Sequence, residues 1–180
     1  MRHLRILETD IYIDSIPDCG AGRRRESERR AVAGIISRVL PGCTLRHAPS
    51  GAPEIDGMHV SVSHSRHYAA VALSEHPVGI DIEERRDGQL ERVATRFLDD
   101  EEMGGGSLSP VELLRAWTAK EAAFKALAPH NDGVMLSDIR LSENMRHACF
   151  GVAHRFDVEH VSHHGNGAPD ALLAVAVRCG

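Results

Sequence analysis

Apolar residues recur at helical spacing in two segments of the chain. In residues 26–40 they repeat every turn until Pro41 and Gly42 interrupt the pattern. A second such segment runs from residue 110 to about residue 127, where Ser109 and Pro110 offer an N-cap and a first-turn proline. The pattern therefore predicts two long helices.

Alternating residues and short apolar runs predict the strands. Residues 5–13 indicate one opening strand, and the polar segment 90–103 has helical character before a glycine-rich break at 104–110. The remaining predicted strands are 58–64, 68–74, 78–84, 135–142, 148–161 and 170–179.

The order of these elements repeats weakly along the chain. A helix, a polar strand and an apolar strand occur in the first part and again in the second. We predict an α+β fold of two pseudo-equivalent halves, residues 1–90 and 91–180, each a small antiparallel sheet packed with a long helix.

Composition narrows the class of protein. The chain has 180 residues, 42% of them apolar, and a formal net charge of -5, which indicates a globular protein and argues against a general nucleic-acid binder. No apolar run approaches the ~20 residues that span a bilayer, and the N-terminus is too polar for a secretory signal. Four cysteines, Cys19, Cys43, Cys149 and Cys179, form no CxxC pair. We expect a reduced, cytoplasmic protein that binds neither nucleic acid nor membrane.

Two acids on one strand form the first candidate site. In residues 78–84, alternation puts Gly79, Asp81 and Glu83 on one face, with the two acids about 7 Å apart along the backbone. A solvated strand face and a cation site both explain such a pair. The glycine is interpreted as giving a ligand room to approach.

The second predicted helix offers a third acid. At about 100° per residue, Glu121 falls inside an apolar arc that includes Trp117 and Phe124, while Lys120 and Lys125 flank the arc. A carboxylate there is costly unless it is paired or bound to metal, but a surface pair between Glu121 and Lys125 is the alternative.

Together, the three acids suit Mg²⁺, which prefers carboxylates, waters and phosphates, and the two lysines would face the same phosphates. Ser63 and His64 end a strand and are donors suited to a phosphate. A serine nucleophile with a histidine base is disfavoured, because neighbours on a strand point to opposite faces and the chain has no G-x-S-x-G elbow. This composition indicates phosphoryl-type transfer.

Two other groups of polar residues each allow two interpretations. The basic run at 22–30 indicates either a solvated helix start or a contact for an anionic small molecule or an acidic partner. The C-terminal histidines, His154, His160, His163 and His164, could bind a metal, but their spacing matches no known ligand pattern.

The residues VGID, at 78–81, and WTAKEAAFK, at 117–125, resemble the bipartite signature of the 4′-phosphopantetheinyl transferase superfamily. The chain length and the histidine strand before the first motif are similar to the monomeric, two-half class that includes the surfactin-synthetase activator. The resemblance is strong from about residue 26 to residue 127.

This resemblance implies a function and a set of site residues. The protein would move the phosphopantetheine arm of coenzyme A to a serine of an apo acyl or peptidyl carrier protein, releasing adenosine 3′,5′-bisphosphate. Asp81, Glu83 and Glu121 would hold Mg²⁺ on the pyrophosphate, with Lys125 supporting the same phosphates, and Glu121 or a water it orients would take the serine proton. His64 with Ser63 would contact the 3′-phosphate, as would Arg30. Trp117 is expected to pack rather than react.

Two departures from the family pattern keep an alternative open. Ala52 stands where the family often has a lysine for a coenzyme A phosphate, although the arginines at 23–25 could compensate. Residues 82–116 separate the two motifs, a shorter gap than is typical of the family. The alternative is a non-catalytic module that binds coenzyme A or a carrier protein on the same scaffold.

Overall fold

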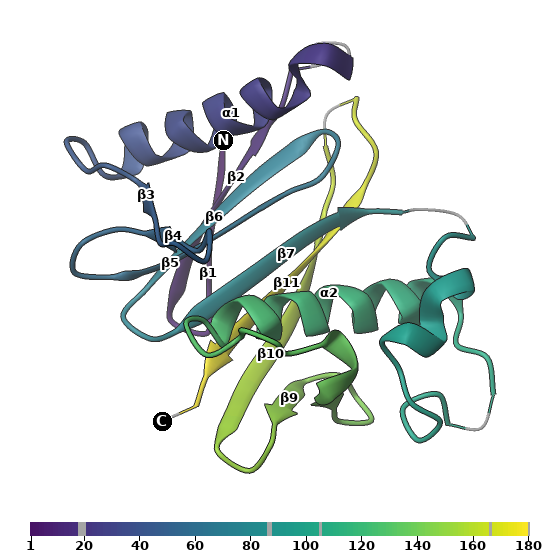
Figure 1. Ribbon diagram of the computed structural model, residues 1–180. Helices are drawn as coiled ribbons and strands as arrows, with labels where there is room; N and C mark the ends of the chain where they lie inside the picture. The colour runs from purple at the N-terminus through teal and green to yellow at the C-terminus, as the bar shows by residue number, and fades with distance from the viewer. Residues whose placement is uncertain (18–20, 86–87, 105, 166, 180) are drawn as a thin grey trace.

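Two antiparallel sheets form the framework of the protein. We describe a computed structural model, which places residues 1–17, 21–85, 88–104, 106–165 and 167–179. The first sheet has the order β1-β2-β6-β5 and the second the order β7-β11-β10-β9-β8 (Figure 1). Their strands are β1 (Arg2–Ile6), β2 (Thr9–Ser15), β5 (His59–His64), β6 (Tyr68–Ser74), β7 (Val78–Glu84), β8 (Ile139–Leu141), β9 (His147–Phe150), β10 (His154–His163) and β11 (Ala171–Arg178). A small ladder pairs β3 (Arg46–His47) with β4 (Pro53–Glu54).

Two predicted strands are each a hairpin. Residues 5–13 were expected to be one strand, but Leu7 and Glu8, with φ of 48° and 59°, turn the chain between β1 and β2. This left-handed turn lacks the Asn-Gly or Gly-Gly signal that usually marks it in a sequence. Residues 148–161 also divide, at Gly151 with φ of 57°, into β9 and β10.

Both long helices form where the periodicity predicts them. The helices are α1 (Arg24–Val39) and α2 (Pro110–Ala126), and the described residues also form three short 3-10 turns: η1 (Ala21–Arg23) before α1, η2 (Glu91–Arg96) between the helices and η3 (Leu136–Asp138) after α2. The Ser109 hydroxyl accepts a hydrogen bond from the Glu112 N–H, and the Glu112 carboxylate accepts one from the Ser109 N–H. This reciprocal capping box confirms the predicted start of the second helix.

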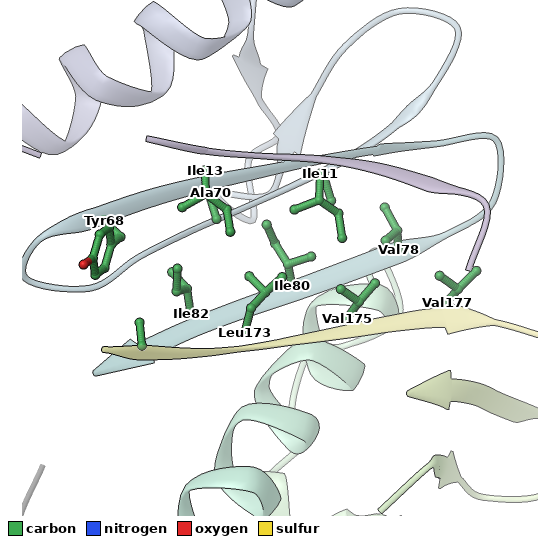
Figure 2. Close-up of a cluster of buried hydrophobic side chains, with 12 residues drawn as sticks. Ile11, Ile13, Tyr68, Ala70, Val78, Ile80, Ile82, Leu173, Val175 and Val177 are labelled. Carbon is green, nitrogen blue, oxygen red and sulfur yellow. The ribbon is translucent and has the colours of Figure 1, made fainter. Parts of the chain in front are cut away.

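The main core lies between the two sheets. Side chains of β2 and β6, such as Ile11 and Ile13, meet Val78, Ile80 and Ile82 of β7 and their neighbours on β11 (Figure 2). Helix α1 covers the other face of the first sheet and α2 the other face of the second. The α+β class, with a long helix on each antiparallel sheet, is confirmed.

Strand β7 crosses to the second sheet. The sequence placed it with the N-terminal half, but its backbone hydrogen bonds run to β11, with Asp81 opposite Ala174. A chain boundary near residue 90 stays a prediction, while the sheet that carries Asp81 is the C-terminal one. The strand's period of two cannot reveal which partner it will pair with.

The thiols of Cys43, Cys149 and Cys179 are free, and Cys19 lies outside the described residues. Among the residues that the structure places, no helix has the length and apolar character needed to cross a membrane.

Candidate active site

Small residues let helix α2 lie directly on β7. A Cβ added at Gly79 would be 1.9 Å from the Ala122 carbonyl oxygen and 2.6 Å from the Ala126 nitrogen. Both atoms belong to the helix backbone, so only a glycine fits this position. The expectation that Gly79 makes room for a ligand is therefore wrong: the glycine makes room for the helix.

The buried face of α2 is built from small side chains rather than large ones. Ala119, Ala122, Ala123 and Ala126 are buried, together with Leu113, Ala116, Thr118 and Lys120. The sequence had centred the apolar arc on Trp117 and Phe124, which are only half-buried. The Trp117 ring packs edge-on against Phe97, with ring centroids 5.2 Å apart. The close helix-strand contact selects alanines, because a large side chain would push the helix away.

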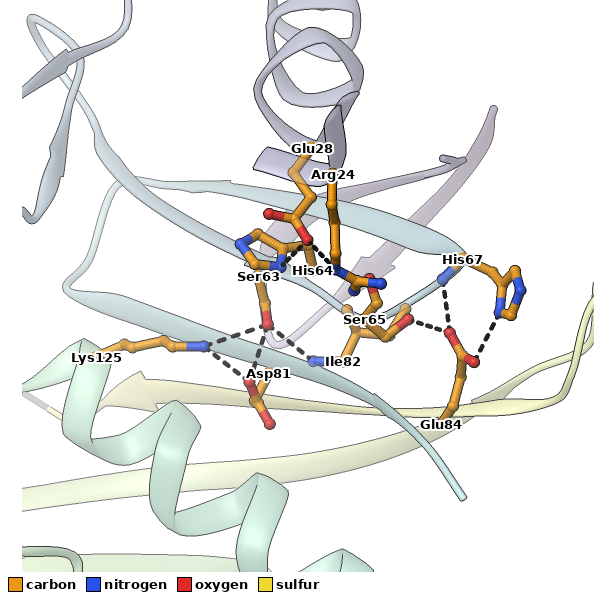
Figure 3. Close-up of polar contacts among 10 residues, drawn as sticks. All are labelled: Arg24, Glu28, Ser63, His64, Ser65, His67, Asp81, Ile82, Glu84 and Lys125. Atoms are coloured by element: carbon orange, nitrogen blue, oxygen red, sulfur yellow. Dashed lines mark hydrogen bonds and ion pairs between the residues drawn. The ribbon is translucent and has the colours of Figure 1, made fainter. Parts of the chain in front are cut away.

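Asp81 on β7 and Lys125 on α2 form an ion pair near the close contact between Gly79 and α2. The Lys125 ammonium donates to Asp81 Oδ1 at 2.8 Å (Figure 3). It also donates to the Ile80 carbonyl oxygen at 3.0 Å. The Ser63 hydroxyl of β5 donates to the same Asp81 oxygen at 2.9 Å. Asp81 is 5% exposed, and its second oxygen, Oδ2, is buried without a hydrogen-bond partner among the described residues.

Glu121 adds a second carboxylate to this region. It lies half-buried one turn before Lys125 on α2. Burial raises the pKa of its carboxyl above the ordinary value, the Lys125 ammonium opposes the rise, and the negative charge of Asp81 adds to it. The charge of Asp81 thus acts on Glu121 although the two residues come from distant parts of the chain. Glu83 lies on the same face of β7 as Asp81 and is half-buried.

The carboxylates of Asp81, Glu83 and Glu121 are the type of oxygen ligand that a magnesium ion prefers. An unsatisfied buried carboxylate oxygen is costly, and a cation removes that cost. The acids are not arranged as a set of metal ligands in this structure. Within the ranges that the structure places, no group of three or more His, Cys, Asp or Glu side chains could hold a metal ion. Asp81 is paired with Lys125 instead.

A cleft opens beside Lys125. It has a volume of about 660 Å³ and lies between the end of α2 and the chain segment 46–62, including Arg46 and Ala52. The lining thus joins the lysine of the second motif to the loop in which Ala52 replaces the family's lysine. The cleft is large enough for part of a small-molecule ligand.

A second groove runs between α1 and β5. Arg25, Arg29 and His47 line it together with His64, over an apolar floor, in a volume of about 850 Å³. The buried acid Glu28 also lines this groove and pairs with Arg24, so the groove's four basic side chains outnumber the one acid and its chemistry suits an anion.

The comparison with known families now decides the assignment. The family model of the 4′-phosphopantetheinyl transferase superfamily matches residues 77–175, from the residue before β7 into β11. This region is more than half of the chain. The chain belongs to the 4′-phosphopantetheinyl transferase superfamily.

One relative agrees with this assignment. The 4′-phosphopantetheinyl transferase gsp of Aneurinibacillus migulanus is 34% identical over 105 residues. That match covers 55% of this chain and 44% of the relative, so less than half of the relative's length is represented.

Within this superfamily fold, Lys120 does not face the site. Its side chain is completely buried, and its ammonium donates to Glu102 Oε2 at 2.7 Å. Burial lowers the pKa of Lys120, and the Glu102 carboxylate opposes the shift. The predicted phosphate contact for Lys120 is not supported, because its side chain is fully buried and its ammonium is directed at Glu102 rather than at the cleft.

Ser63 and His64 separate as the strand alternation requires. Ser63 is buried and its hydroxyl points to Asp81, whereas His64 is exposed and faces α1, with its Nδ1 atom 3.6 Å from Glu28 Oε1 (Figure 3). The two residues therefore cannot act as one phosphate contact.

Arg30 also lies apart from His64. Its side chain is 80% exposed and approaches Glu26 at 3.9 Å, so the α1 arginines that reach the groove are Arg25 and Arg29. A helix turns by about 100° per residue, which places neighbouring arginines on different faces.

The sequence patterns did not identify Glu28 and Glu102, two acids whose hydrogen bonds stabilise the structure around the site. Glu28 is buried on α1 and accepts from Arg24 Nε at 2.8 Å, and Arg24 donates to the Ser65 carbonyl oxygen. Glu102 accepts from Lys120 and from the Leu141 N–H. The signal for Glu28 was present, because an arginine four residues earlier on a helix is a common partner. Glu102 stood in an acidic run with no periodic signal.

Glu84 secures the end of β7. It accepts hydrogen bonds from the Ser65 hydroxyl at 2.6 Å and from the backbone and ring nitrogens of His67, each at 2.8 Å (Figure 3). Burial raises the pKa of Glu84, but these hydrogen bonds outweigh burial and lower it below its ordinary value. The turn between β5 and β6 is thus tied to the strand that carries Asp81.

The C-terminal histidines have separate neighbours. His160 Nε2 lies 3.0 Å from the Arg115 carbonyl oxygen, the His163 ring packs edge-on against Tyr68, and His164 pairs with Asp170. The structure therefore gives no support to a histidine metal site in the residues it describes.

Proposed function

We propose that this protein transfers the phosphopantetheine arm of coenzyme A to a serine of an apo carrier protein. The observation that carries the proposal is the meeting of Asp81 and Lys125, from the two separate motifs, beside the cleft. A carboxylate with one unsatisfied oxygen, a lysine and a second acid are the groups that phosphoryl-type transfer uses to position and neutralise phosphates.

Glu121 is the proposed general base. It lies half-buried on α2 one turn before Lys125, and burial raises the pKa of its carboxyl, which makes it a stronger base than an exposed glutamate. The serine oxygen forms a bond to the phosphorus that carries the pantetheine arm, and the bond from that phosphorus to the bridging oxygen of the pyrophosphate breaks. The serine proton passes to Glu121 or to a water that it orients. Adenosine 3′,5′-bisphosphate leaves with the electron pair.

The other residues bind and orient coenzyme A. Asp81, Glu83 and Glu121 would hold Mg²⁺, which supplies charge neutralisation of the pyrophosphate when bound. Lys125, which lines the cleft, would contact the same phosphates by exchanging one of its present hydrogen-bond partners for a phosphate oxygen. His64, with Arg25 and Arg29, forms the basic side of the second groove and is proposed for the 3′-phosphate.

A mass-shift assay tests the transfer. Purified protein, Mg²⁺ and coenzyme A are incubated with several apo carrier proteins, and intact mass spectrometry is expected to show one phosphopantetheine arm on one of them. Asp81→Asn and Glu121→Gln are each expected to lower the rate by at least about 100-fold, because each removes charge from the reacting centre. Asp10→Asn, at a half-buried position of β2 where the carboxylate pairs with His3 rather than with a site residue, serves as the matched control.

The same purified protein is used to distinguish a transferase from a non-catalytic binding module. Calorimetry that shows Mg²⁺-dependent binding of coenzyme A, with no mass gain on any carrier, would favour the non-catalytic alternative. Ala52 on the cleft wall is the residue that motivates this second measurement, since it offers no cation to a phosphate.

A further inference from the structure

The Ser63 hydroxyl has no free hydrogen-bonding capacity. It donates to Asp81 Oδ1 at 2.9 Å, accepts from the Ile82 N–H at 3.2 Å and accepts from the Lys125 ammonium at 3.3 Å (Figure 3). A serine hydroxyl has one proton and two lone pairs, so these three contacts use it fully. A phosphate oxygen could bind Ser63 only after the hydroxyl had left Asp81.

Ser61 provides an internal comparison two residues earlier on the same strand. Its hydroxyl accepts from the Ile80 N–H at 3.1 Å, just as the Ser63 hydroxyl accepts from the Ile82 N–H. Both serines thus join β5 to β7, where the two sheets meet. Of the two, the contacts to Asp81 and Lys125 belong to Ser63.

Lys125 cannot hold Asp81 by itself once a ligand is bound. Its ammonium has three donors, and they go to Ser63, the Ile80 carbonyl oxygen and Asp81. A contact between Lys125 and a phosphate must release at least one of them, and the lysine stem is long and flexible. The hydrogen bond from Ser63 to Asp81 does not depend on that ligand, because both residues lie on strands.

We propose that Ser63 is a positioning residue that holds Asp81 Oδ1, so that Oδ2 is kept for the cation. This inference rests on the proposed function, and it replaces the phosphate contact that the family resemblance implied for Ser63. Asp81 Oδ2 is buried without a hydrogen-bond partner among the described residues, which is the state expected of an oxygen reserved for an ion. A carboxylate with one oxygen fixed presents the other in a single direction.

Two matched variants separate positioning from sheet bridging. Ser61→Ala removes the hydrogen bond from the Ile80 N–H, and Ser63→Ala removes the equivalent one from the Ile82 N–H together with the contacts to Asp81 and Lys125, so a larger loss of stability is expected for Ser63→Ala in urea unfolding. Nuclear magnetic resonance of the Asp81 side chain, recorded without metal or coenzyme A, is expected to report a changed carboxyl resonance in Ser63→Ala and an unchanged one in Ser61→Ala, because only Ser63 donates to that carboxylate.

Calorimetry then measures the consequence for the cation. With coenzyme A present, Ser63→Ala is expected to bind Mg²⁺ about 10-fold or more weakly than wild type, the range for loss of a residue that orients a ligand. Ser61→Ala is expected to bind it as wild type does. In steady-state transfer, Ser63→Ala should raise the Mg²⁺ concentration needed for half-maximal rate more than it raises the KM for coenzyme A.

The outcomes distinguish this inference from the proposed function. An Asp81 carboxyl that keeps its wild-type resonance in Ser63→Ala would overturn the positioning role, whether or not the wild type is an active transferase. Equal losses of Mg²⁺ affinity in the two variants would do the same, since sheet bridging alone would explain them. A wild-type protein with an ordered Asp81 that modifies no carrier would count against the transferase and leave the metal-free result to decide the role of Ser63.

Discussion

Gly79→Ala tests whether the fit of α2 on β7 sets up the site. The added Cβ would lie 1.9 Å from the Ala122 oxygen and 2.6 Å from the Ala126 nitrogen, and ordinary contact begins at 3.4 Å. Both obstacles are backbone atoms within one turn of helix, so no side chain can rotate out of the way. The helix itself must move, by about 1.5 Å if the shortest contact opens to ordinary distance.

The magnitude follows from that displacement. Overpacking typically costs 1–3 kcal/mol, and backbone contacts on a buried helix place this case near about 3 kcal/mol. Replacing a glycine also stiffens the unfolded chain, which returns about 0.4–1 kcal/mol, so we expect a net loss of about 2 kcal/mol. A shift of about 1.5 Å would also separate Lys125 from Asp81, and misplacement of about 1 Å can cost about 100-fold in rate.

Urea unfolding and the carrier mass-shift assay measure the two effects. Gly34→Ala is the control, because at this half-buried position of α1 its added Cβ meets nothing closer than Arg38 Nη2, at 3.8 Å. That variant should be as stable as wild type or slightly more stable, with normal activity. Wild-type stability and activity in Gly79→Ala would refute the claim that this close contact positions the site.

Three further changes test other parts of the structure. Lys120→Met leaves the buried Glu102 carboxylate without its cation, so unfolding should show a loss of about 3–5 kcal/mol that adding Glu102→Gln largely restores; an unaffected single variant would contradict the buried pair. Ser109→Ala removes the cap of α2 and should cost about 1 kcal/mol in urea unfolding, whereas an equal cost from Ser107→Ala would argue against a capping role. Glu84 has a lowered pKa in the folded protein, so its stabilising contribution is present above its ordinary pKa and is lost as the pH falls through the folded value. The difference in unfolding free energy between wild type and Glu84→Gln should therefore shrink on acidification, and a difference that grows would refute this assignment.

Local features of the chain could be predicted from the sequence. The capping box at Ser109 depends on residues three apart, and the division of β7 into an apolar face and an acidic face depends on its period of two. The two motifs that carry the family resemblance were also readable, because each is short and contiguous. These interactions lie within one element, so a single sequence contains the information that specifies them.

The directions of several site residues were decided only by the tertiary structure. Lys120 and Lys125 lie on the same helix, yet one is buried against Glu102 and the other meets Asp81. Which side each lysine faces depends on how the helix is rotated on the sheet, and that rotation is set by the contact at Gly79 rather than by the largest apolar residues.

The role of Ser63 has the same origin. Its sequence context suggested a phosphate contact, but its hydroxyl is used by Asp81, Ile82 and Lys125, which come from a neighbouring strand and a distant helix. The sequence by itself determined which residues carry the chemistry, because residue type and local period are written in the chain. Only the packing of the two sheets and α2 decided which of those residues touch one another, since hydrogen-bond partners far apart in sequence are chosen when the sheets pair and the helix docks.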